Sequence, residues 1–281
     1  MTLPPPLEYK ATGLRLFWMT VVGRAYPRII GLNRERSWLF FDVLMPVLNV
    51  AAYVLVYRAI GAPEEYVGFV VVGGAMTAFW INILWSMSSQ LYWEKEQGNL
   101  GLYIVSPASM MAILLGMALG GLLATLFRAV VIILAGSLLF NVSYTIINLP
   151  QLLAVFALSM VSLYGLGMMS SSIFLLLSRE AYHLAALATE PVYLASGMYF
   201  PLKNLGFWAA GASSLIPLSL GLDAMRQLVF AGGAQVGFLS VPVELAILVI
   251  LSVLYIGGAR WLLARIERLA VKEGRLAENR R

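Results

Sequence analysis

Long apolar stretches without charged residues dominate the hydropathy pattern of this chain. No Asp, Glu, Lys or Arg occurs in residues 66–93, 97–127 or 129–178. A helix needs about 20 apolar residues to cross the hydrocarbon core of a bilayer, so the last stretch holds two crossings. The polar breaks between apolar stretches predict spans at about 38–57, 66–93, 107–139, 150–177, 181–200 and 240–262. We therefore expect an all-α polytopic membrane protein with six transmembrane helices, forming one domain over residues 38–262.

Two segments outside these spans also carry a pattern. In residues 1–37, apolar side chains recur at helical spacing, which predicts an amphipathic helix lying in the membrane interface. We expect Arg15 and Arg24, at the margins of its apolar stripe, to snorkel to lipid headgroups, and Pro27 to end or kink the helix. Such a helix either anchors the chain or transmits force. In residues 201–233, frequent Pro and Gly predict short re-entrant helices rather than a regular span.

The break between the second and third spans has its own turn chemistry. Gly98 permits a sharp exit from the second span, since glycine adopts backbone angles that other residues avoid. A short helix is expected over residues 99–105. Ser106 suits a helix N-cap and Pro107 a first helical position, which predicts that the third span begins there.

The positive charges test the six-span layout. With six spans both ends lie on one side, which then holds fifteen Lys and Arg residues against three on the other, while Arg128 lies inside the third span. Cytoplasmic segments carry such an excess, so both termini are predicted in the cytoplasm, with residues 263–281 as a basic cytoplasmic tail. The location expected is the cytoplasmic (inner) cell membrane.

Composition narrows the chemistry. The chain is 60% hydrophobic and 12% charged, with no cysteine and one histidine, His183. The lack of cysteine excludes disulfides, thiolate catalysis and cysteine-ligated metals, and one histidine does not favour a histidine metal site. No H-E-x-x-H or G-x-S-x-G motif occurs, so we predict no catalytic residues and no metal site. The net charge of +5 follows lipid topology and does not indicate nucleic-acid binding. An intramembrane enzyme or a channel is a distant alternative.

Two sequence motifs resemble those of a known transporter family. The first is Glu94-Lys-Glu-Gln-Gly-Asn-Leu100 followed by Ser106-Pro107, although Asn99 stands where the family usually has threonine. The second begins Ser196-Gly197 and ends Phe200-Pro201, with Pro217 and Arg226 further on; its marked positions are Gly197, Pro201, Pro217 and Arg226. Their order and spacing resemble the permease subunits of type-2 ATP-binding-cassette exporters, of the daunorubicin-resistance and polysaccharide-export kind.

The resemblance implies that membrane passage and ATP hydrolysis belong to separate subunits. The chain has no G-x-x-x-x-G-K-[ST] phosphate loop, so ATP and magnesium would bind a separate ATPase and no cofactor would bind this chain directly. Two ATPases would serve two permease subunits, forming a homodimer or a heterodimer. A hydrophobic or amphipathic, drug- or lipid-like compound would be moved outward; a lipid-linked polysaccharide is the alternative substrate.

The resemblance also suggests where the ATPase docks. The loop residues Glu94, Lys95, Glu96, Gln97, Gly98 and Asn99 would form its contact surface, with Arg179 and Glu180 in a second cytoplasmic loop. Read from the residues alone, the first loop is also consistent with a solvated helix end. The second is equally consistent with a topological anchor.

Polar residues within the spans are candidates for the translocation path. Glu190 lies about 15 Å deep in the fifth span, where it either faces the path or pairs with Arg179 or Arg128. Arg128 either snorkels to outer headgroups or binds an anionic substrate group. Asn82, Ser86 and Gln90 make the second span polar, and either join helices or line a hydrated vestibule.

Overall fold

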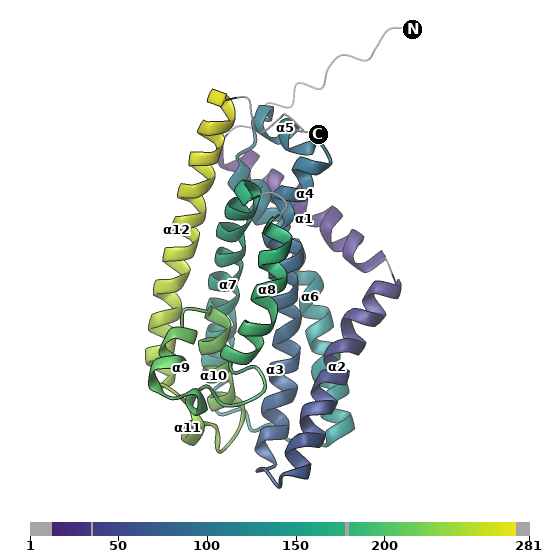
Figure 1. Ribbon diagram of the computed structural model, residues 1–281, viewed down its shortest axis with the longest axis vertical. Coiled ribbons are helices and arrows are strands. Elements are labelled where there is room, and N and C mark those ends of the chain that lie inside the picture. The colour runs from purple at the N-terminus through teal and green to yellow at the C-terminus, as the bar shows by residue number, and fades with distance from the viewer. Residues whose placement is uncertain (1–12, 35, 178–179, 274–281) are drawn as a thin grey trace.

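Five helical stretches in the computed structural model are long and apolar enough to cross a membrane (Figure 1). The structure describes residues 13–34, 36–177 and 180–273, and no strand occurs in these ranges. The five are Phe40–Ala59 in α2 (Arg36–Ala59), Glu65–Glu96, Met110–Phe140 (α6), Leu149–Leu175 in α7 (Leu149–Leu177) and Val241–Ile266 in α12 (Val241–Glu273). The prediction of an all-α polytopic membrane protein is confirmed.

The predicted fifth span, residues 181–200, corresponds to helix α8, Glu180–Ala195. Its 16 residues give a length of about 24 Å, shorter than the hydrocarbon core. The helix ends five residues before the predicted boundary because Gly197 adopts a left-handed conformation, with a φ of 67°. Five of the six predicted spans are therefore matched by long apolar helices, and the six-span count stays a prediction.

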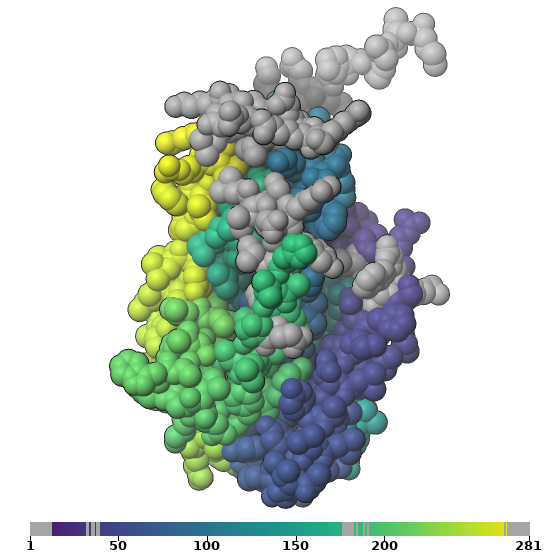
Figure 2. Space-filling view, viewed as in Figure 1, coloured from purple at the N-terminus to yellow at the C-terminus, as the bar shows by residue number. Residues whose placement is uncertain are grey.

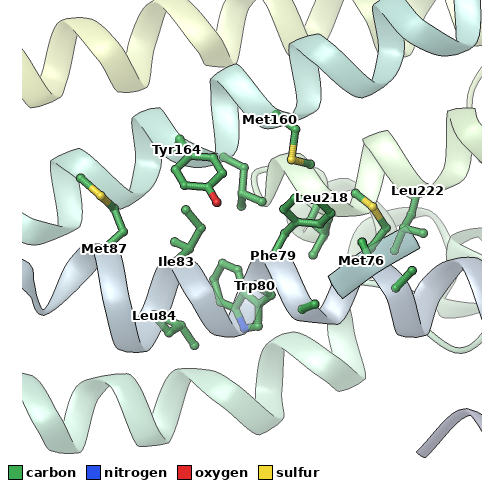
Figure 3. Close-up of a cluster of buried hydrophobic side chains, with 14 of the residues drawn as sticks. Met76, Phe79, Trp80, Ile83, Leu84, Met87, Met160, Tyr164, Leu218 and Leu222 are labelled. Carbon is green, nitrogen blue, oxygen red and sulfur yellow. The ribbon is translucent and has the colours of Figure 1, made fainter. Parts of the chain in front are cut away.

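The second predicted span forms the centre of the bundle. It runs from α3 (Glu65–Ile81) through a π-helical turn, η1 (Asn82–Ser88), into α4 (Gln90–Glu96). Almost every residue of α3 is buried, because the whole helix is apolar and other elements surround it. Figure 3 shows large side chains of α3 and η1 beside Met160 and Tyr164 of α7 and Leu218 and Leu222 of α10 (Pro217–Val229).

The amphipathic N-terminal helix, α1 (Gly13–Arg34), packs on α6 rather than lying apart from the bundle. A Cβ at Gly116 or Gly120 would meet the backbone or Cβ atoms of α1, so these glycines allow close contact of the two helices. The helix continues through Pro27 to Arg34, so Pro27 does not end it, and a kink at Pro27 stays a prediction. Most of α2, in contrast, stands at the edge of the molecule with many apolar side chains exposed (Figures 1 and 2).

Residues 196–237 form a compact cap at the end of the bundle remote from α5 (Asn99–Val105), coloured green in Figures 1 and 2. Its elements are η2 (Leu202–Leu205), α9 (Phe207–Ser213), α10 and α11 (Gly233–Val236). Every residue of α10 is buried. The predicted short helices are therefore present, while their depth in a membrane stays a prediction.

The turn into the third span differs from the prediction. Helix α6 begins at Met110, three residues later than expected, and its N-cap is Ser109, whose side chain accepts a hydrogen bond from Ala112 N at 3.1 Å. Ser106 has extended backbone angles and ends α5 instead. The two serines have the same capping chemistry, so the sequence alone did not distinguish them.

Candidate functional site

A buried carboxylate, Glu94, lies at the junction of three helices. Its Oε1 accepts hydrogen bonds from Arg24 of α1 and Gln90 of α4, both at 2.9 Å. Its Oε2 accepts from Asn99 at 3.0 Å and from Tyr103 of α5 at 2.7 Å. The Glu94 side chain is only 8% exposed, so four donors replace the water that an ionised carboxylate requires.

Two arginines of α1, one helical turn apart, insert toward this junction. Arg24 forms the ion pair with Glu94 and also lies 4.9 Å from the ring centroid of Tyr103. Arg28 donates to Gln90 Oε1 at 2.7 Å and to the hydroxyl of Ser86. The expectation that Arg24 snorkels to headgroups was wrong, because a buried carboxylate offers it a partner inside the protein.

The electrostatic setting of the junction follows from burial. Burial, together with the hydrogen bond to the Glu94 carboxylate, raises the pKa of the Tyr103 hydroxyl, which therefore stays a donor. Burial also lowers the pKa of Arg28, while nearby Tyr164 and Glu94 act in the opposite direction. The junction is thus a set of donors arranged around one negative charge.

The sharp turn between α4 and α5 exposes an apolar surface. Gly98 has a φ of 78°, which confirms the predicted use of glycine, and α5 covers the predicted residues 99–105. Leu102 and Val105 are 65% and 80% exposed, and Trp93 is 48% exposed. We call Trp93, Leu102 and Val105 the α5 face.

The loop assigned to ATPase contact therefore divides into two parts. Glu96, Gln97 and Gly98 are exposed beside the α5 face, whereas Lys95 and Asn99 are half-buried. Glu94 is buried and joins α1, α4 and α5, so it can position the loop but presents little surface to a partner. Because Glu94 bonds all three helices, a displacement of the α5 face would move α1, α4 and α5 together.

The structure brings the predicted path residues of the second span against partners in the same chain. Asn82, in the π-helical turn, accepts a hydrogen bond from the Tyr164 hydroxyl at 3.1 Å. Ser86 and Gln90 both bond Arg28. These hydrogen bonds join different helices of the chain, and the place of the three residues in a translocation path stays a prediction.

Arg128 is paired rather than exposed to headgroups. Its Nη1 lies 2.6 Å from Asp42 Oδ2, and its side chain is 8% exposed. The expectation that Arg128 snorkels was wrong, because Asp42 of α2 provides a counter-charge within the bundle. This ion pair fastens α2 to α6.

Three predicted site residues fall outside what the structure describes. Arg179 lies in the gap at 178–179. Glu180 and Glu190 belong to α8, but their side chains are not among the described ones. Their predicted roles stay predictions.

Arg226 of α10 binds the cap to the central helix. Its guanidinium donates to the carbonyl oxygens of Gly197 and Met198, both at 2.6 Å, of Phe69 at 2.9 Å and of Phe200 at 3.1 Å. The side chain is 2% exposed. Arg226 thus donates to backbone carbonyl groups of the turn after α8 and of α3. These contacts give the arginine of the motif a structural role.

The remaining motif residues set helix starts in the cap. Pro201 precedes η2 and Pro217 begins α10, where a missing N–H costs nothing. Among the described residues, no group of three or more His, Cys, Asp or Glu could hold a metal ion.

Sequence reasoning missed the partners in these contacts, namely Arg28, Tyr103 and Asp42. Two signals could have found some of them. Arg24 and Arg28 are four residues apart and so share a helix face, and Gly116 and Gly120 form the small-residue spacing that accepts a close helix. No signal in the sequence linked Asp42 to Arg128.

Comparison with known proteins places this geometry in context. Residues 28–230 match the model of the ABC-2 type transporter family. Over 139 residues the chain is 27% identical to a protein named probable multidrug ABC transporter permease YbhR, from Escherichia coli K12 and from E. coli O157:H7. That match covers 48% of this chain and 36% of each relative, so the chain spans about a third of their length.

Proposed function

The chain belongs to the ABC-2 type transporter family, and on this premise we propose that it is the permease subunit of an ATP-driven exporter. It carries a hydrophobic or amphipathic, drug- or lipid-like compound outward. ATP and magnesium bind a separate ATPase, present in two copies beside two permease subunits. The chain itself catalyses no reaction. A lipid-linked polysaccharide is the alternative cargo.

One observation carries the coupling part of this proposal: the junction at Glu94. The α5 face is exposed and apolar, which is unfavourable on a surface in water and suits a protein contact. Directly behind it, the Glu94 carboxylate bonds side chains of α1, α4 and α5. A push on the α5 face by a moving ATPase therefore reaches α4, which is continuous with the buried central helix α3.

The proposed topology places the α5 face in the cytoplasm and the cap on the outer side of the cytoplasmic membrane. The charge asymmetry supports it, since fifteen of the nineteen Lys and Arg residues then lie inside. The cap is held on the central helix by Arg226, so motion of that helix and of the cap are linked. Glu190 remains a proposed path residue, with α8 available to line a path between two permease subunits.

Purification of the tagged chain from its native membrane tests the proposal. We expect an ATPase that contains a phosphate-loop motif to be recovered with it, and inside-out vesicles holding both to take up cationic amphiphiles only with ATP and magnesium. A matched preparation of Leu102→Asp should recover little ATPase. Recovery of no ATPase with either chain, together with ATP-independent uptake, would instead indicate a channel.

A further inference from the structure

Two neighbouring cavities of opposite character lie at the cap end of the bundle. The first, of about 440 Å³, lies where the α2–α3 turn meets the connection from α6 to α7. Arg58, Glu64 and Glu65 line it together with polar residues of that connection. The second, of about 330 Å³, is lined by residues of α3, α6, α7 and α10 and presents no polar surface. We call them the charged cavity and the apolar cavity.

The charged cavity is lined by one positive and two negative side chains that do not pair with one another in the described structure. Arg58 donates to the carbonyl oxygen of Phe140 at 3.4 Å, and its guanidinium lies 5.8 Å from the centroid of the Phe140 ring. Within the described ranges, no ion pair joins Arg58 to Glu64 or Glu65. All three charged residues are exposed. A ligand that carries one positive and one negative group can therefore match the cavity.

The apolar cavity has the surroundings that a hydrocarbon chain requires. Val72, Ile133, Leu152, Phe156 and Met225 contribute to its lining. Among its lining residues Ile146 is 54% exposed and Leu153 is 58% exposed, so the cavity opens on the surface of the bundle. Leu153 belongs to a helix long and apolar enough to cross a membrane.

A thin wall separates the two cavities. Residues 142–146 have no regular secondary structure, and Thr145 N and Ile147 N donate to the carbonyl oxygens of Val229 and Leu228 at 2.8 and 2.9 Å. Tyr144 lines the apolar cavity and Thr145 the charged one, so neighbouring residues of this segment belong to different cavities. The ring of Tyr144 lies 5.6 Å from the ring of Phe230, which lines the charged cavity.

We propose that one phospholipid with a zwitterionic headgroup, in the leaflet at the cap end, lies over the exposed residues 143, 145 and 146 and occupies both cavities. Its phosphate is placed at Arg58, its ammonium at Glu64 and Glu65, and one acyl chain in the apolar cavity. An acyl chain gains little by exchanging lipid neighbours for apolar side chains, so selectivity comes from the headgroup. The proposal concerns a retained lipid and does not depend on which compound is transported.

The absence of native cysteine makes a site-specific fluorescence test direct. Ile146→Cys is labelled with bimane and reconstituted in vesicles of dioleoylphosphatidylglycerol that contain a tenth of brominated phospholipid. The brominated lipid is either phosphatidylethanolamine or phosphatidylglycerol. We expect the first to quench about threefold more strongly than the second. Val253→Cys on α12, which is 68% exposed and far along the chain from both cavities, is the control and should show no headgroup preference.

Charge variants then separate the headgroup from the cavity. Arg58→Gln combined with Glu65→Gln should abolish the preference at Ile146→Cys, whereas Arg260→Gln, an exposed position on α12, should leave it intact. Leu153→Cys at the same rim provides a second reporter if Ile146→Cys fails to fold. Equal quenching by the two lipids at both rim positions would overturn the proposal. So would quenching at Val253→Cys with none at the rim, since the cavity would then exclude acyl chains.

Discussion

Arg24 and Glu94 are separated by 70 positions in the sequence, yet their side chains form an ion pair of 2.9 Å. The pair connects an N-terminal helix that could have been a simple membrane anchor to the loop proposed to meet the ATPase. Because Glu94 also receives the hydroxyl of Tyr103, the same carboxylate holds α5. The amphipathic helix is thus bound to the part of the molecule that we propose to meet the ATPase.

The first prediction concerns this ion pair. Glu94→Gln keeps the shape of the side chain but removes the charge, leaving Arg24 half-buried without its counter-charge. We expect a loss of about 1–3 kcal/mol of stability, seen as a lower melting temperature in detergent. Glu96→Gln, an exposed neighbour, should have little effect. In a double-mutant cycle with Arg24→Gln, the two losses should be clearly non-additive. Strict additivity would mean that the pair contributes nothing.

The second prediction concerns the α5 face. Val105→Asp and Glu96→Lys should reduce recovery of the ATPase from solubilised membranes several-fold, because both alter the exposed loop surface. Neither variant should change the melting temperature of the isolated permease, since Val105 is 80% exposed and Glu96 is exposed as well. Leu215→Asp, equally apolar and 64% exposed but in the cap, is the matched control and should recover normal amounts. Normal recovery with all three variants would remove this loop from the interface.

The sequence predicted the local features of residues 94–105 and missed their long-range contacts. Glycine at position 98 and the helix over residues 99–105 follow from short-range chemistry, and both were correct. Glu94 differs from Lys95 and Glu96 only in its partners, which come from α1 and α5. In a linear pattern all three residues belong to one charged helix end. The burial of one of them depends on tertiary packing, which hydropathy does not encode.

The same distinction explains the error at Arg128. Apolar length predicted six crossings, of which five are matched by long apolar helices. An arginine in an apolar stretch, however, can pair either with a lipid headgroup or with a carboxylate inside the protein. Arg128 uses Asp42, which lies in another helix 86 positions earlier. The packing of α2 beside α6 decides between the two solutions. Such packing becomes visible only once the bundle is assembled.

The third prediction tests the attachment of the cap to the central helix. A Cβ at Gly73 would overlap the carbonyl oxygen of Met198, one of the acceptors of Arg226. Gly73→Ala should therefore destabilise the protein by about 1–3 kcal/mol, since backbone must shift to admit the methyl group. Gly257→Ala is the matched control: it is also helical, with nothing within 4 Å of the added Cβ. That control should be neutral or slightly stabilising. Equal melting temperatures for the two variants would contradict the contact.

The fourth prediction concerns topology. Single cysteines placed after Met1, at Asn141 and at Arg281 can be labelled without background, because the chain has none of its own. A membrane-impermeant maleimide added to intact cells should label Asn141→Cys alone. After permeabilisation all three should react. Labelling of the C-terminal position in intact cells would overturn the six-span layout and the outer location of the cap.

The fifth prediction concerns two buried carboxyl groups where the cap meets α12. Gln227 Nε2 lies 3.0 Å from Asp223 Oδ2 and 3.4 Å from Glu244 Oε2, so the two acids are close neighbours. Both are almost fully buried. The two acids share one amide donor, so the other hydrogen bonds that each acid makes determine what its replacement costs.

The hydrogen bonds of the two acids differ. Asp223 Oδ2 accepts from Phe238 N at 2.8 Å as well as from Gln227, so it joins α10 to the segment after α11. Glu244 Oε1 has no hydrogen-bond partner among the described residues. Glu244→Gln keeps the shape of the side chain and an oxygen that can accept from Gln227, and should change stability by less than about 1 kcal/mol. Asp223→Asn should cost about 2–3 kcal/mol, because an amide oxygen is a weaker acceptor than a carboxylate for two donors in a buried site. Melting curves of the two variants in the same detergent test this order, and a larger loss for Glu244→Gln would contradict it.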